Sequence, residues 1–136
     1  MSFRVQRSRF SKPGIPSGAV YVGRPSQWGN PAIIGEYYRS SGGAAVLVEN
    51  NYLAVDIFYD HCKHLASNQP EQFFAWIFPL IDKNLCCWCK PTDVCHADVL
   101  LFLSKIVKSV AGLEDRFTRI SEGVKDWPPL SDFIKI

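Results

Sequence analysis

The residues best suited to chemistry are crowded into one short stretch of the chain. Four of its five cysteines lie between positions 86 and 95, and a histidine follows the last of them. Such crowding makes a poor disulfide framework, because bridged residues need a defined separation. Thiolates are also the ligands of soft metal ions and the nucleophiles of thiol enzymes. The stretch therefore predicts reduced thiols or metal ligands, and with them a reducing, cytoplasmic setting.

A strand predicted over residues 85–89 decides which of these cysteines act together. Side chains alternate between the two faces of a strand, so Cys86 points away from its neighbours and is expected in the core. A Lys-Pro-Thr-Asp turn then brings the chain back to the start of a helix. Three thiolates and one imidazole form a normal zinc complement. The predicted metal ligands are Cys87, Cys89, Cys95 and His96.

The spacing leaves alternatives open. The C-x-C and C-H pairs are tighter than the usual C-x2-4-C, and adjacent residues often cannot both reach one ion. If His96 points away, His61, His64, water or a substrate would fill the fourth position. Without a metal, Cys95 beside His96 resembles an activated nucleophile, with Asp98 nearby to orient a base. Cysteines also pack buried strands with no chemical role.

A second stretch places polar groups on a backbone that cannot form regular structure. Residues 23–31 read G-R-P-S-Q-W-G-N-P, with two prolines and two glycines in nine positions. A guanidinium, a hydroxyl, an indole and an amide of this kind can hold a planar or anionic ligand. The alternative is an ordinary turn closed by a hydrophobic lid and an Asx turn. The predicted ligand-binding residues are Arg24, Ser26, Trp28 and Asn30.

The elements that must position these two stretches follow from hydrophobic periodicity. The predicted strands cover residues 3–10, with a basic outer face, 19–22 and 85–89. Helices are expected over residues 45–66, over residues 71–82 with an interruption or end near Pro79, and over an amphipathic segment from Val99 to Val110. If the strands that end in the two stretches are adjacent and parallel, both stretches lie at one edge of the sheet.

Length and composition set the fold class. With 136 residues, 47% hydrophobic residues and a net charge of +2, the chain suits one domain with one core. The charge is too small to indicate nucleic acid, and no apolar run is long enough to cross a bilayer. The prediction is an α/β fold, a small sheet that is at least partly parallel with helices packed on it. Residues 1–112 form this domain, and residues 113–136 are a C-terminal extension that packs on it or binds a partner.

The two stretches together resemble a known family. Y-V-G-R-P-S-x-W-G-N-P over residues 21–31, C-W-C-x-P over 87–91 and C-H-A-D-V-L over 95–100 are similar to the domain of unknown function catalogued as number 4326. The resemblance covers roughly residues 3–110 and carries no established reaction. It implies that the two stretches belong to one site. Its bacterial and tailed-phage setting implies nucleotide or DNA-modification metabolism, or interference with host defence, in a bacterial or host cytoplasm.

These observations favour a zinc-binding protein with a site for a nucleotide, a nucleobase or a similar planar anionic metabolite. Asp98 or His96 would transfer protons if the site is catalytic. The sequence does not decide whether the protein is an enzyme. One alternative is a non-enzymatic module that binds protein or nucleic acid and carries a structural metal. The other is a metal-free enzyme that depends on Cys95.

Overall fold

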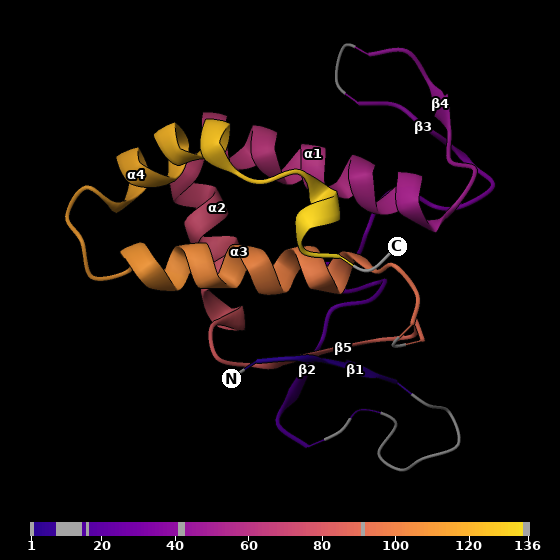
Figure 1. The fold of residues 1–136 in the computed structure, drawn as a ribbon, viewed down its shortest axis with the longest axis horizontal. Coiled ribbons are helices and arrows are strands. Elements are labelled where there is room, and N and C mark those ends of the chain that lie inside the picture. Colours follow the sequence, from indigo (N-terminus) through magenta and orange to yellow (C-terminus); the bar gives the residue numbers. More distant parts are fainter. Residues whose placement is uncertain (1, 8–14, 16, 41–42, 91, 135–136) are drawn as a thin grey trace.

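Three short strands pair in parallel and form the sheet on which the chain is built (Figure 1). The computed structural model describes residues 2–7, 15, 17–40, 43–90 and 92–134. The strand order is β1-β5-β2, with β5 hydrogen-bonded on both sides. The bounds of these strands are Arg4–Gln6 for β1, Ala19–Tyr21 for β2 and Asn84–Cys87 for β5. The predicted α/β class with a parallel sheet is confirmed.

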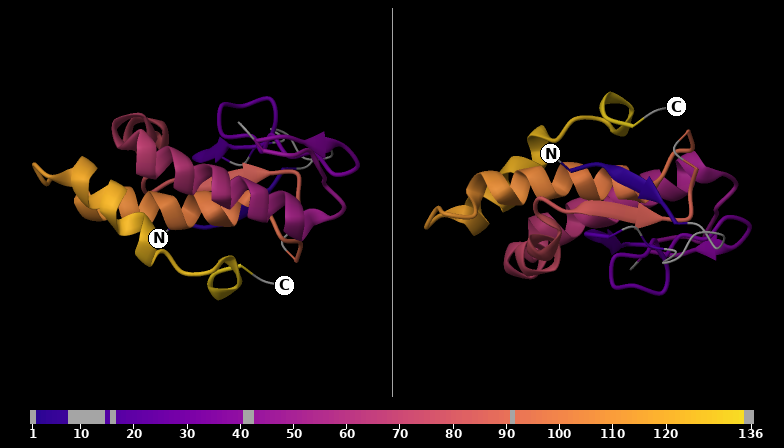
Figure 2. Two further views of the ribbon diagram at one scale, coloured as in Figure 1. Left: turned by 90° about the horizontal axis from the view of Figure 1, so that it is seen from above. Right: turned by 90° about the horizontal axis from the view of Figure 1, so that it is seen from below.

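Helices cover one face of this sheet, as the two views of Figure 2 show. Their bounds are Asn51–Asn68 for α1, Pro70–Ile77 for α2, His96–Val110 for α3 and Arg116–Gly123 for α4. Short 3-10 turns follow at Phe78–Leu80, Val124–Asp126 and Leu130–Asp132. Among the described residues, no helix is both long and apolar enough to cross a membrane.

The first predicted helix starts later in the structure than its periodicity indicates. Residues 45–66 were expected to be helical, but Val46–Leu47 forms strand β4, which pairs antiparallel with β3 at Tyr37–Tyr38. Asn50 supplies the reason, because its side-chain oxygen accepts a hydrogen bond from Leu53 N at 2.8 Å and caps the helix there. Hydrophobic alternation does not predict this hairpin, because each of its strands has only two residues.

The other elements lie close to their predicted positions. β1 is shorter than the predicted strand 3–10, and residues 8–10 lie outside the described part of the chain. The second helix ends at Ile77, close to the predicted interruption near Pro79, because proline cannot continue the α-helical hydrogen bonding. β5 starts and ends within two residues of its prediction, and α3 extends the predicted amphipathic segment back to His96.

The core lies between the sheet and the helices. Leu85 on β5, Phe58 on α1, Phe73 on α2 and Leu100 on α3 all belong to one buried hydrophobic cluster. A smaller cluster of Ala32, Val48 and Ala54 holds the β3–β4 hairpin against α1. The main cluster fixes the position of β5 beneath the helices.

The segment after α4 runs past α1 and α3 (Figure 1). Its aromatic side chains pack against rings on both helices. The Trp127 ring stacks on Tyr59 of α1 with 6.1 Å between ring centroids. Phe133 stacks on Phe102 of α3 at 4.6 Å and meets the edge of Tyr59 at 5.3 Å. The Tyr59 hydroxyl donates a hydrogen bond to the carbonyl oxygen of Pro128 at 2.7 Å.

Tyr59→Phe tests the contribution of this last contact. Removing the hydroxyl leaves the Pro128 carbonyl without that donor, so we expect the free energy of unfolding to fall by about 1 kcal/mol. Burial raises the pKa of Tyr59 to about 12. The unfolded tyrosine ionises near pH 10, so its contribution to stability is complete below about pH 10 and is lost as pH rises toward 12.

Urea unfolding at several pH values measures both effects. The wild-type protein should lose stability more steeply than Tyr59→Phe between pH 10 and 12. Tyr37→Phe, which changes an exposed tyrosine, is the control and should leave stability almost unchanged. Equal slopes for wild type and Tyr59→Phe would contradict the prediction.

Candidate functional site

The carboxyl ends of all three parallel strands meet at one edge of the sheet. β5 leads into the cysteine stretch, and β2 leads into the loop of residues 23–31, called here the Arg24 loop. Val22 N donates to Cys86 O at 2.8 Å, so the pairing continues past the end of β2. The expected geometry, in which adjacent parallel strands bring the two stretches to one edge, is present.

Three cysteines form a compact sulfur cluster at this edge. The Sγ atoms of Cys87, Cys89 and Cys95 all lie within 4.8 Å of one another, and two of them, on Cys87 and Cys95, are 3.1 Å apart. Among the described residues, no other group of three histidine, cysteine or acidic side chains brings its ligand atoms this close together. Cys86 lies outside the cluster and is buried. A three-cysteine cluster of this kind is compatible with metal binding.

The distances suit a tetrahedral ion. Sulfur atoms that bind zinc at about 2.3 Å in a tetrahedron stand about 3.8 Å apart. Cys87 Sγ and Cys95 Sγ would therefore separate by roughly 0.7 Å to take one ion between them. Cys95 caps α3, and Ala97 N donates to its sulfur at 3.5 Å. The cluster thus receives a backbone donor from the N-terminus of a helix, where negative charge is favoured.

The thiols influence each other's ionisation. Hydrogen bonds from Cys87 and Cys95, together with the positive charge of Arg4, lower the pKa of Cys89 well below its ordinary value. The pKa of Cys87 is raised by its hydrogen bonds with Cys89 and Cys95 and by its burial. One thiolate, on the half-buried Cys89, is therefore stabilised by two neighbouring thiols.

Arg4 is a site residue that the sequence reasoning missed. Alternation along the first strand predicts a basic outer face, but the Arg4 side chain is only 10% exposed and turns toward the cluster. It hydrogen-bonds to Cys95, and its Nε lies 3.6 Å from Asp98 Oδ1. Burial alone would lower the pKa of Arg4, but the Cys95 contact and the Asp98 charge outweigh it, and the net pKa is raised.

No local signal marks Arg4 in the sequence. Its orientation depends on its register opposite Leu85, which directs it to the same face as the core. That register is a long-range property of the parallel pairing. Asp98, which is predicted as a proton-transfer group, forms the ion pair with Arg4, and its side chain is 22% exposed.

His96 ties the start of α3 to the end of β2. Its Nε2 lies 2.8 Å from the carbonyl oxygen of Val22, so this nitrogen carries the hydrogen and donates it. In the neutral ring Nδ1 is then an acceptor, and it lies 3.7 Å from Cys95 Sγ. His96 is not part of the three-sulfur group, although it is the imidazole that contacts one of its members. The exposed His61 and His64 on α1 also lie outside the group.

Arg24 and Ser26 are held by the turns of their own loop. The Arg24–Pro25 bond is cis, and Ser26 N donates to Gly23 O at 2.9 Å. The exposed Arg24 side chain donates through one terminal nitrogen to Asn30 O at 3.2 Å. A side chain on Gly29 would begin 3.0 Å from Arg24 Cγ, so glycine permits this close approach.

Trp28 and Asn30 are engaged with the protein. The Trp28 indole nitrogen donates to Trp76 O at 2.8 Å, and the Trp76 indole nitrogen donates back to Gln27 O at 3.0 Å. Asn30 is 8% exposed, donates to Ala54 O at 2.9 Å and accepts from Ala32 N at 2.9 Å. These two side chains anchor the loop to α2 and α1. A ligand role for Asn30 would require it to exchange these bonds.

Arg4→Gln tests the role of the buried cation. Removing it leaves Asp98 and the Cys89 thiolate without their nearest positive charge, so we expect the free energy of unfolding to fall by about 2–4 kcal/mol. Arg119→Gln is the matched control, because Arg119 forms an exposed pair with Asp115 at 2.9 Å and should cost less than about 1 kcal/mol. Chemical denaturation of both variants measures the difference, and equal losses would contradict the prediction.

Comparison with known proteins places the chain in a family. Residues 5–106 match the model of a family described as a domain of unknown function (DUF4326), which covers both the sulfur cluster and the Arg24 loop. Searches of curated proteins and of solved structures found no match. Because the match spans most of the 136 residues, the chain belongs to the DUF4326 family of domains of unknown function.

Proposed function

We propose that this protein binds a zinc ion through Cys87, Cys89 and Cys95, and that a ligand site lies beside the ion at the carboxyl edge of the sheet. The observation that carries the proposal is the approach of three sulfur atoms within 4.8 Å of one another. Zinc suits thiolates because it accepts a tetrahedral set of soft ligands and needs no redox change.

Charge supports this assignment. Three thiolates around a divalent cation leave a net charge of −1, and the buried Arg4, which also pairs with Asp98, places a positive charge beside Cys95. His96 would take the fourth position through Nδ1, which faces Cys95 Sγ, while Nε2 keeps its bond to the Val22 carbonyl. If water or a ligand atom holds that position instead, we assign His96 to proton transfer. If the site is catalytic, Asp98 would assist this proton transfer through its ion pair with Arg4.

The second part of the proposal is the ligand, a nucleotide or a similar planar anionic metabolite. Arg24 is exposed at the end of β2, next to the strand that leads into the sulfur cluster. Its guanidinium offers a bidentate partner for phosphate or carboxylate, and Ser26 offers a hydroxyl on the same loop. Trp28 would contribute by holding the loop rigid. The bacterial or phage setting implied by the resemblance, and a cytoplasmic location, stay predictions.

A second candidate function is a metal-free thiol enzyme. The contact between Cys95 Sγ and His96 Nδ1 favours it, because it pairs a nucleophile with a base. The carbonyl of Val22 orients that base through Nε2. Metal content separates this candidate from the first.

Elemental analysis of protein purified without added metal tests the zinc site. We expect about one zinc per chain in the wild type and less than about 0.2 in Cys87→Ser, because one thiolate ligand is lost. Cys86→Ala is the control, since Cys86 is equally buried on the same strand but lies outside the cluster, and it should keep the zinc. A folded wild-type protein with less than about 0.2 zinc per chain would contradict the proposed metal site and favour the thiol enzyme.

Arg24→Ala tests the anionic part of the ligand. Calorimetric titration with the four ribonucleoside 5′-monophosphates should show about tenfold weaker binding in this variant, because a charge-assisted contact to phosphate is lost. Arg119→Ala removes a guanidinium from the distant α4 and should bind as the wild type does. Equal affinity for Arg24→Ala and wild type would remove Arg24 from the proposal.

A further inference from the structure

A hollow of about 380 Å³ lies beside the Arg24 loop. Its walls come from three elements, because Phe58, His61 and Leu65 face it from α1, Gln72 and Trp76 from α2, and Gln27 from the loop. The α1 residues recur at three- and four-residue spacing and the α2 residues at four, so each helix presents one face to the hollow. Its volume falls within the range of about 300–1,000 Å³ that small-molecule sites have.

The walls of this hollow are held in place without a ligand. Trp76 is bonded to the Arg24 loop at two points: its backbone oxygen accepts from the Trp28 indole, and its own indole nitrogen, on the ring, donates to Gln27 O. Phe58 is buried behind it, with the two ring centroids 6.3 Å apart. A binding surface that is already ordered loses little conformational entropy when a ligand arrives.

The lining also indicates the class of ligand. It combines aromatic and aliphatic surface with the amides of Gln27 and Gln72 and the imidazole of His61, all three on exposed residues. It contains no carboxylate, lysine or arginine. Amides and imidazole can both donate and accept hydrogen bonds, and the ring faces can stack. This set suits an uncharged planar heterocycle with polar edges.

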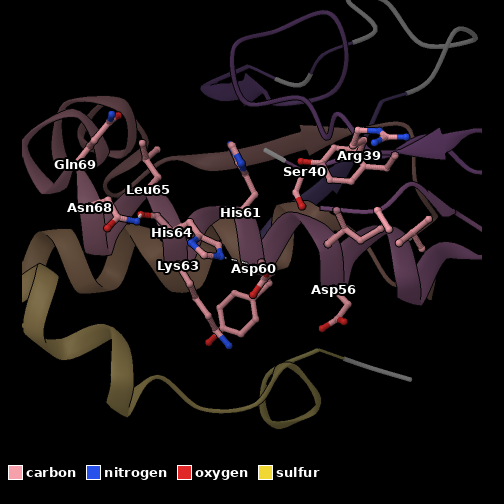
Figure 3. A pocket seen from close by; sticks show the side chains of 15 residues that line it. Arg39, Ser40, Asp56, Asp60, His61, Lys63, His64, Leu65, Asn68 and Gln69 are labelled. Carbon is pink, nitrogen blue, oxygen red and sulfur yellow. Dashed lines mark hydrogen bonds and ion pairs between the residues drawn. The ribbon is translucent and has the colours of Figure 1, made fainter. Parts of the chain in front are cut away.

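A larger hollow of about 780 Å³ shares His61 and Leu65 with this one but is not a single site (Figure 3). In Figure 3, His61 and Leu65 point to one side of α1, while Lys63 points to the other. One small ligand cannot contact both sides of a helix. The smaller hollow is lined by residues of α1, α2 and the Arg24 loop together.

We propose that the hollow between α1, α2 and the Arg24 loop binds a nucleobase-like heterocycle, with Trp76 as the stacking surface and Gln72 and His61 as edge readers. The inference rests on the ligand part of the proposed function and locates the planar part of that ligand. The hollow also adjoins the sulfur site through one side chain, because the Phe58 ring meets the His96 ring edge-on at 5.2 Å. Gly29, which lines the hollow, is the residue against which Arg24 packs.

NMR titration with adenosine, guanosine, cytidine and uridine tests the proposal on the full chain. The Trp76 indole N–H signal should shift with at least one nucleoside, while the signal of Trp88, which does not line the hollow, stays in place. Gln72→Ala and His61→Ala should each weaken that binding at least about fivefold, the effect of losing one hydrogen bond. Gln69→Ala, an exposed glutamine outside this hollow, is the matched control and should bind as the wild type does.

Two results would overturn the inference in distinguishable ways. If the nucleoside 5′-monophosphates bind in an Arg24-dependent manner but Gln72→Ala and His61→Ala bind as tightly as wild type, the hollow is not the base site and the proposed function stands. If neither nucleosides nor monophosphates bind, the hollow and the ligand part of the proposed function both fail. Zinc content is measured separately and decides the metal part.

Discussion

The central position of β5 in the parallel sheet is the constraint on which the candidate site depends. Its pairing with β1 on one side and β2 on the other directs three carboxyl ends to one edge. The cysteine stretch follows β5 directly, so its place is set by the strand that is most completely hydrogen-bonded. Ligands of open α/β sheets bind at such edges, because loops and helix N-termini converge there.

The start of α3 completes this arrangement. Cys95 caps the helix and joins two cysteines from the end of β5, while the next residue, His96, bonds to the backbone at the end of β2. Burying thiolate charge is costly unless donors and cations accompany it. Ala97 N supplies the donor through the local N-cap of α3, and the Arg4 guanidinium supplies the cation through the pairing of distant strands. The sulfur cluster is therefore supported by each strand of the parallel sheet.

The Arg24 loop is anchored to the helices by two of its own side chains. Two of its four polar side chains, Trp28 and Asn30, hold the loop to the helices through bonds to Trp76 O and Ala54 O. Arg24 remains exposed, and Gln27, Gly29 and Pro31 of the loop line the hollow at Trp76. The aromatic contacts from Trp76 through Phe58 to His96 connect this hollow to the sulfur cluster.

The sequence by itself determined the α/β class, the strand of cysteines and the grouping of Cys87 with Cys89 and Cys95, because hydrophobic period and strand alternation are local properties. It also indicated that the two motif stretches share one edge, provided their strands pair in parallel. Only the tertiary structure decided that pairing, the inward turn of Arg4 and the anchoring of Asn30. Each of these depends on partners distant in sequence, such as Leu85 for Arg4 and Ala54 for Asn30. Local periodicity carries no information on such partners, since strand register and loop docking are set by which buried surfaces fit together.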